Sequence, residues 1–89
     1  MRAIVTVIGK DRVGIIAGVS GTLAWNQVNI LDISQTILQE YFTMIMLVDL
    51  DKMSCTFEEL TQRLNEEGTR LGVVITIQRE EIFQSMHTV

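Results

Sequence analysis

The fold of this protein is decided by residues 2–15, RAIVTVIGKDRVGI, in which an apolar run gives way to a turn and then to a helical pattern. Residues 2–8 are β-branched or apolar at nearly every position, which is typical of a strand covered on both faces and therefore central in its sheet. Residues 9–12 interrupt this run. From Val13 to about Gln27, apolar residues recur at helical spacing, which predicts a helix directly after the turn.

Two rows of this helix are candidates for packing against the sheet. The predicted apolar row consists of Ile16, Val19 and Leu23. The second row has small side chains that would let the helix approach the sheet closely, and it consists of Ala17, Gly21 and Ala24. Gly18 and Gly21 lower the helix propensity by about 1 kcal/mol each, and tight packing is the expected reason for their presence.

The next two segments have the pattern of a β-hairpin. Residues 28–38 alternate, with Leu31, Ile33 and Ile37 on one face and polar residues on the other, as in a strand with one covered and one open face. Gln39-Glu40 is the predicted turn. Residues 41–50 form a strand that is apolar on both faces, so both faces require a cover.

A second helix and two further segments complete the chain. Thr56 and Glu59 form a capping box before an apolar run that continues at helical spacing to Leu71, and Gly72 suits a helix C-terminus. Residues 73–77 have the pattern of a strand. The final segment, residues 80–89, carries apolar side chains at helical spacing, namely Ile82, Phe83 and Met86.

This order predicts an α+β fold, the ferredoxin-like βαββαβ sandwich. It has a four-stranded antiparallel sheet with two helices on one face, and a short C-terminal tail helix follows. We expect one domain over residues 1–79 and a helical extension over residues 80–89, because the chain has only 89 residues and neither proline nor a Gly/Ser linker.

Composition excludes several classes of function. The chain is 47% hydrophobic and 20% charged, which excludes a disordered protein. Its net charge of -4 argues against direct binding to nucleic acid or to an anionic membrane. The longest uncharged stretch, residues 13–31, contains too many polar residues for a membrane span. Since the one cysteine excludes a disulfide framework, we expect a cytoplasmic protein.

Residues able to carry out catalysis or to bind a metal are sparse. His87 is the only histidine and lies in the tail, and Cys55 lies in a loop between hydroxyl residues. Asp49 and Asp51 point to the same side of a strand end, but two carboxylates make a poor cation site. We therefore predict a protein that is not an enzyme and that has neither a cofactor nor a metal.

The turn after the first strand offers chemistry for binding a small molecule. A helix N-terminus presents unpaired N–H groups that suit a carboxylate, and Gly14 leaves room for a ligand or a partner backbone to approach. Asp11 can cap the helix or accept an ammonium group, and Asn29 can both donate and accept hydrogen bonds. Spacing alone favours the plainer alternative, in which Asp11 is only a cap and Gly14 only a packing glycine.

Together these residues resemble an ACT domain, over roughly residues 3–79. The resemblance rests on KDRVGI at residues 10–15 and NQVNILDISQTI at residues 26–37, with Val13 where many members have proline. It is nearest to small stand-alone bacterial and archaeal members and to glycine-cleavage repressor-like regulators. The ligand-binding residues that it implies are Asp11, Arg12, Val13, Gly14, Ile15, Asn29 and Ile30.

The resemblance implies a regulatory module that senses an amino acid or a similar small metabolite. ACT domains commonly pair side by side, with the ligand between the first loop of one chain and the second strand of the other. A homodimer is also expected from the apolar hairpin strand and tail, whose candidate interface residues are Met44, Met46, Ile82, Phe83 and Met86. Alternatively the tail folds onto its own sheet. The alternative function is a ligand-free interaction module that regulates a metabolic enzyme or a transcription regulator.

Overall fold

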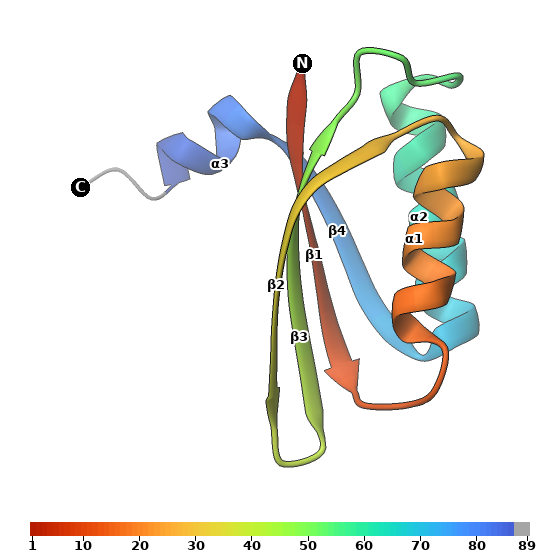
Figure 1. Cartoon of the computed structure of the whole chain (residues 1–89), viewed down its shortest axis with the longest axis vertical. Helices are drawn as coiled ribbons and strands as arrows, with labels where there is room; N and C mark the ends of the chain where they lie inside the picture. Colours follow the sequence, from red (N-terminus) through yellow and green to blue (C-terminus); the bar gives the residue numbers. More distant parts are fainter. Residues whose placement is uncertain (87–89) are drawn as a thin grey trace.

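The computed structural model describes residues 1–86, except for the side chain of Met86, so the predicted tail residue His87 lies outside the described residues. The elements in chain order, labelled in Figure 1, are β1 (Arg2–Lys10), α1 (Ile15–Trp25), β2 (Asn29–Leu38), β3 (Tyr41–Asp49), α2 (Phe57–Leu71), β4 (Val73–Arg79) and α3 (Glu80–Met86).

The four strands form one antiparallel sheet in the order β2-β3-β1-β4. Figure 1 shows α1 and α2 packed side by side on one face of this sheet, while α3 extends on the other side. The ferredoxin-like fold predicted from the sequence is therefore confirmed, including its short C-terminal helix. The first strand is central, as its apolar run predicted, and β2 and β4 are the edges.

The hydrophobic core lies between the sheet and the two helices. In β1, Val5 is opposite Met46 of β3 and Ile77 of β4, and all three point toward the helices. Every second residue of β1 and β3 is buried in this way, which is the period of two that a strand imposes. Leu23 of α1 and Leu60 of α2 close the core from above, and both are fully buried.

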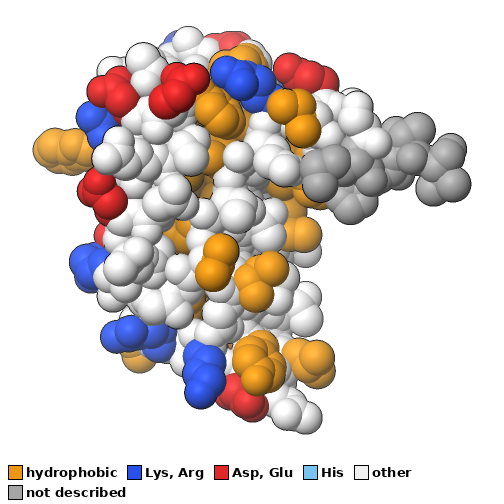
Figure 2. All heavy atoms as spheres, turned by 180° about the vertical axis from the view of Figure 1, so that it is seen from behind, with side chains coloured by type: hydrophobic (Ala, Val, Ile, Leu, Met, Phe, Trp, Pro, Cys, Tyr) orange, Lys and Arg blue, Asp and Glu red, His pale blue; other side chains and the backbone are white. Residues whose placement is uncertain are grey.

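The opposite face of the sheet is only partly covered. Ile8 of β1, Ile45 of β3 and Val74 of β4 are 52%, 42% and 66% exposed, respectively. In Figure 2, hydrophobic side chains gather toward the lower right of the view, on the side away from α1 and α2. The prediction that the first strand is covered on both faces is therefore wrong for the single chain.

The buried row of α1 differs from the prediction by one residue. The residues that face the sheet are Ile15, Val19 and Leu23, whereas Ile16 is 42% exposed. The reason is the start of the helix: Gly14 is the N-cap residue, so Ile15 is the first helical residue and turns directly into the core. Val19 and Leu23 were predicted correctly, but the spacing did not determine whether Ile15 or Ile16 begins the buried row.

The small residues of α1 also have a different role from the predicted one. Ala17, Gly21 and Ala24 are exposed and do not face the sheet. Gly18 instead lies against α2, where an added Cβ would be 2.8 Å from Cδ1 of Leu71. Tight packing therefore explains one of the two helix glycines, and the contact is between the two helices.

The capping box predicted for α2 is present. The hydroxyl of Thr56 accepts a hydrogen bond from the amide of Glu59, and the Glu59 carboxylate accepts one from the amide of Thr56. The hydrogen bond from the Thr56 amide, followed by one from the Thr56 side chain, lowers the pKa of Glu59 below its ordinary value, because hydrogen bonds to the carboxylate favour its charged form. The helix ends at Gly72, whose φ of 76° is left-handed.

We predict that Thr56→Ala lowers the free energy of unfolding by about 1 kcal/mol, because it leaves an N-terminal amide of α2 without its partner. Thr56→Ser keeps the hydroxyl and is expected to lose much less stability. Urea unfolding followed by circular dichroism measures both variants, and equal losses for the two would contradict a capping role.

Candidate functional site

The loop between β1 and α1 lies beside the β2–β3 hairpin. Lys10 pairs with Tyr41 at the end of the sheet, and the amide of Asp11 donates a hydrogen bond of 2.7 Å to the carbonyl of Glu40. Gly14 has a φ of 95°, a left-handed conformation that glycine adopts without a steric penalty. The loop is thus fixed to the hairpin at one end and enters α1 through a glycine at the other.

Asp11 is not the cap of α1. Gly14 is exposed and occupies the N-cap position, and among the described residues no side chain caps the first amides of α1. Asp11 is also exposed, and Val13 is 99% exposed. The plainer alternative, in which Asp11 serves only as a helix cap, is therefore wrong.

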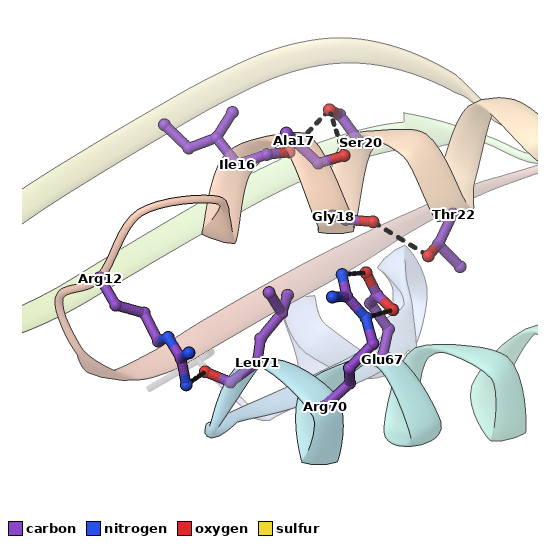
Figure 3. Close-up of polar contacts among 9 residues, drawn as sticks. All are labelled: Arg12, Ile16, Ala17, Gly18, Ser20, Thr22, Glu67, Arg70 and Leu71. Atoms are coloured by element: carbon purple, nitrogen blue, oxygen red, sulfur yellow. Dashed lines mark hydrogen bonds and ion pairs between the residues drawn. The ribbon is translucent and has the colours of Figure 1, made fainter.

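Arg12 links this loop to the second helix. Its Nη1 donates a hydrogen bond of 3.1 Å to the carbonyl of Leu71, at the C-terminus of α2, as Figure 3 shows. A cation at this position suits the partial negative charge of a helix C-terminus. The expected ligand residue Arg12 thus has a second, structural contact that the sequence pattern did not predict.

Asn29 and Ile30 lie at the opposite end of α1 from the loop. Asn29 begins β2 and is exposed, and it lines a pocket of about 430 Å³ together with Gln27 and Asp49. The 11 residues of α1, roughly 16 Å of helix, separate this pocket from Gly14. A single chain does not bring the two halves of the expected ligand site together.

The candidate interface residues differ in their exposure. Met44 and Met46 are fully buried beneath the helices. The prediction that they lie at a dimer interface is therefore wrong, because a second folded copy cannot reach them. The period of two directs them into the core. Ile82 is 48% exposed and Phe83 is half-buried, whereas the side chain of Met86 lies outside the described residues.

A groove between the two helices was not predicted. It measures about 550 Å³ and is bordered by Gly18 and Trp25 of α1 and by Arg70 of α2. In its wall, the guanidinium of Arg70 donates hydrogen bonds of 2.8 and 2.6 Å to both carboxylate oxygens of Glu67, and this pairing lowers the pKa of Glu67. The uncharged stretch over residues 13–31 was the available signal for this surface.

Residues 1–86 contain neither a candidate metal site nor a helix that could span a membrane. In this range, no three or more His, Cys, Asp or Glu residues are grouped so that they could hold a metal ion. No helix in the same range is long and apolar enough to cross a membrane.

Comparison with known proteins places the chain in a family. Residues 2–78 match the sequence profile of the ACT domain. The chain belongs to the ACT domain family. An ACT domain is a regulatory fold, and members of the family generally bind small-molecule effectors and dimerise.

Several relatives of this ACT domain share its full length. It is 62% identical over 89 residues to a UPF0237 protein of Clostridium acetobutylicum, covering 100% of both chains. A solved ACT domain protein from Streptococcus pneumoniae is 49% identical, with a TM-score of 0.82 over 93% of each chain. A putative glycine cleavage system transcriptional repressor shares the fold at 22% identity, with a TM-score of 0.75 over 88% of this chain and 44% of that one.

We predict that Gly14→Ala lowers the free energy of unfolding by about 1 to 2 kcal/mol, because a Cβ disfavours the left-handed conformation. No atom lies within 4 Å of an added Cβ at this position, so steric crowding by neighbours does not contribute. Gly14→Asn is the matched control, since asparagine tolerates left-handed φ, and it is expected to lose less stability. Urea unfolding that ranks asparagine below alanine would contradict this account.

Proposed function

We propose that this ACT domain is a non-catalytic sensor of an amino acid or a similar small metabolite in the cytoplasm, where it acts as a homodimer in metabolic regulation. The ligand lies between two copies, held by the β1–α1 loop of one and by the start of β2 of the other. The observation that carries this proposal is the exposed edge of β2, because it supports the pairing on which the shared site depends.

β2 has the character of a strand that pairs with another chain. It is 10 residues long and lies at the sheet edge, and all of its side chains except Ile30 are exposed. Edge strands that remain unpaired usually carry lysine, proline or other charges, whereas β2 has Asp32 as its one charged residue. A second copy would complete the hydrogen bonding of this edge.

Apolar side chains beside this edge support the same pairing. Ile33 and Ile37 are on the helix side of the sheet, opposite Met46 and Phe42, yet they are 43% and 51% exposed because α1 does not extend over them. A second copy placed edge to edge would remove these side chains from water. They replace Met44 and Met46 as the proposed interface residues, and Ile82, Phe83 and Met86 remain proposed contacts of the tail.

The direction of pairing determines which groups meet. In an isologous antiparallel pairing of β2 with its copy, with the two-fold axis between Ile33 and Ser34, Asn29 of one chain lies opposite Leu38 of the other. Leu38 immediately precedes the hairpin turn, and the carbonyl of Glu40 in that turn accepts the hydrogen bond from Asp11. The loop of one chain and Asn29 of the other therefore come together at this interface, although α1 separates them within one chain.

The residues at this interface suit an amino acid. The amides near Val13, Gly14 and Ile15 would bind a carboxylate, as helix N-termini do. Ile15 is 2% exposed as a whole residue, whereas Val13 and Gly14 are exposed, so the amides of Val13 and Gly14 are the accessible ones in this loop. The carboxylate of Asp11 or the side-chain oxygen of Asn29 would bind the ammonium group. The ligand would stabilise one dimer geometry, with a coupling of about 1–3 kcal/mol.

Calorimetric titration with the twenty amino acids is expected to show binding heat for at least one of them. Gly14→Leu and Asn29→Ala should abolish this heat, because they alter opposite halves of the shared site. Asn65→Ala changes an exposed asparagine of α2 and is the matched control that keeps binding. Absence of heat for all twenty in the wild-type protein would remove the ligand proposal.

Pairing is tested separately by sedimentation of Ile33→Lys. The added charge is expected to separate the side-by-side dimer while leaving the fold intact, because the position is already 43% exposed. A wild-type chain that sediments as a monomer even at millimolar concentration would overturn the pairing.

The second candidate is a ligand-free module that binds a metabolic enzyme or a transcription regulator. The exposed apolar side chains on the open face of the sheet, Ile8, Ile45 and Val74, favour it. This function would be supported if the protein captured a defined partner without added metabolite and if calorimetric titration with the amino acids gave no binding heat.

A further inference from the structure

The outer surface of α1 differs from that of an ordinary surface helix. The stretch from residue 13 to residue 31 contains no Asp, Glu, Lys, Arg or His, and α1 lies entirely within it. The neighbouring α2 has the usual pattern, with an apolar side on the sheet and charged residues outside, among them Glu58, Arg63 and Glu66. A helix that is hydrophobic on every side is normally buried on every side, and α1 comes close to this with Ser20 and Thr22 as its only polar side chains.

Trp25 projects from this uncharged surface. It lies in the last turn of α1, is 85% exposed, and borders the groove between α1 and α2. A tryptophan buries roughly 150–250 Å² when it is covered, and it is among the residues that contribute most to protein interfaces. This side chain is therefore the strongest candidate contact on the helix layer.

A hollow lies beside the projecting tryptophan. No atom is found within 4 Å of a Cβ placed on Gly21, so the space above this residue is open. Farther along the groove, Gly18 lies against the paired side chains of Arg70 and Glu67, which form a polar wall, and Ala17 also borders the groove (Figure 3). The same surface thus contains a projecting side chain, Trp25, and a groove that could accept the tryptophan of a second copy.

We propose that a second copy of this chain packs against the helix layer, with the two α1 helices antiparallel and crossing near Gly21. In that arrangement, four residues separate the crossing point from Trp25 in one direction and from Ala17 in the other. A two-fold rotation therefore places Trp25 of each copy in the hollow beside Ala17 and Gly18 of the other, against the Arg70 guanidinium. The absence of a side chain on Gly21 lets the helices approach closely at the crossing point, whereas the space beside Gly18 is already filled by α2 of its own chain.

A second copy fits this patch better than an unrelated protein does. An isologous interface requires that the same patch supply a projection and its matching hollow, and this patch supplies both. The two tryptophans alone would bury roughly 300–500 Å², a large part of the roughly 1,200 Å² that a small stable interface requires. The uncharged outer surface of α1 supplies further area without burying an unpaired charge.

This helix-to-helix contact does not depend on the side-by-side pairing of β2. The patch lies on top of the helix layer, whereas β2 is an edge of the sheet (Figure 1). If both contacts form, two side-by-side dimers join through their helix layers into an assembly of four chains. If the β2 pairing fails, the helix contact remains as a dimer.

Trp25 is the only tryptophan of the chain, so its fluorescence reports this contact directly. We expect the emission maximum to move to shorter wavelength, and iodide quenching to weaken, as protein concentration rises from nanomolar to high micromolar. Sedimentation over the same range should show association with the same midpoint. Emission that remains typical of a fully exposed indole up to millimolar protein would overturn the proposal, whatever the state of the β2 edge.

Three variants separate this contact from the alternatives. Gly21→Glu places like charges at the crossing point and should weaken the fluorescence-detected association on the order of tenfold or more. The open space above Gly21 accommodates the side chain, and circular dichroism verifies the fold. Gln62→Glu adds the same charge on α2 outside the groove residues, and Ile33→Lys alters only the β2 edge, so both should keep the fluorescence change. Loss of the change in either control, or its persistence in Gly21→Glu, would overturn the proposal.

Discussion

The structure depends on how much of the sheet its helices can bury. Four strands present two faces and two edges, and a chain of 89 residues provides two long helices to cover them. Those helices bury one face of β1 and β3 completely, but they leave Ile33 and Ile37 of β2 and Ile8 of β1 in contact with water. Since exposed apolar area favours association, the incomplete cover directs the molecule toward assembly, and the proposed ligand site follows from that assembly.

The same constraint underlies the role proposed for the β1–α1 loop. Asp11 is fixed to the hairpin through Glu40, and Arg12 is fixed to the end of α2 through Leu71. These bonds hold the uncapped N-terminus of α1 beside the hairpin whose outer strand is proposed to receive a second copy. A ligand bound there would contact the hairpin, the first helix and, through Arg12, the second helix. Such a loop is suited to convert binding into a change of packing, which is the task of a regulatory module.

Several features could be predicted from the sequence because they depend on neighbours in the chain. The capping box at Thr56, the turn at Gln39-Glu40 and the helix end at Gly72 are set by residues within four positions of one another, and all three are present. Contacts over longer distances were harder to predict. Ile16 was expected in the core, yet Ile15 occupies that place, since the direction in which α1 leaves Gly14 depends on its attachment to the rest of the fold. Met44 and Met46 were expected at an interface and are buried, because the strand pattern does not say which face the helices cover.

The sequence by itself therefore determined the order of strands and helices and the family, because local hydrogen bonding and the periods of strand and helix dictate the elements. Only the tertiary structure decided which side chains remain in water. It placed Asn29 and Gly14 at opposite ends of α1, and it exposed Trp25 beside a groove between two helices. The physical reason is that exposure depends on what packs above a residue, and the residues that pack there are distant in the chain.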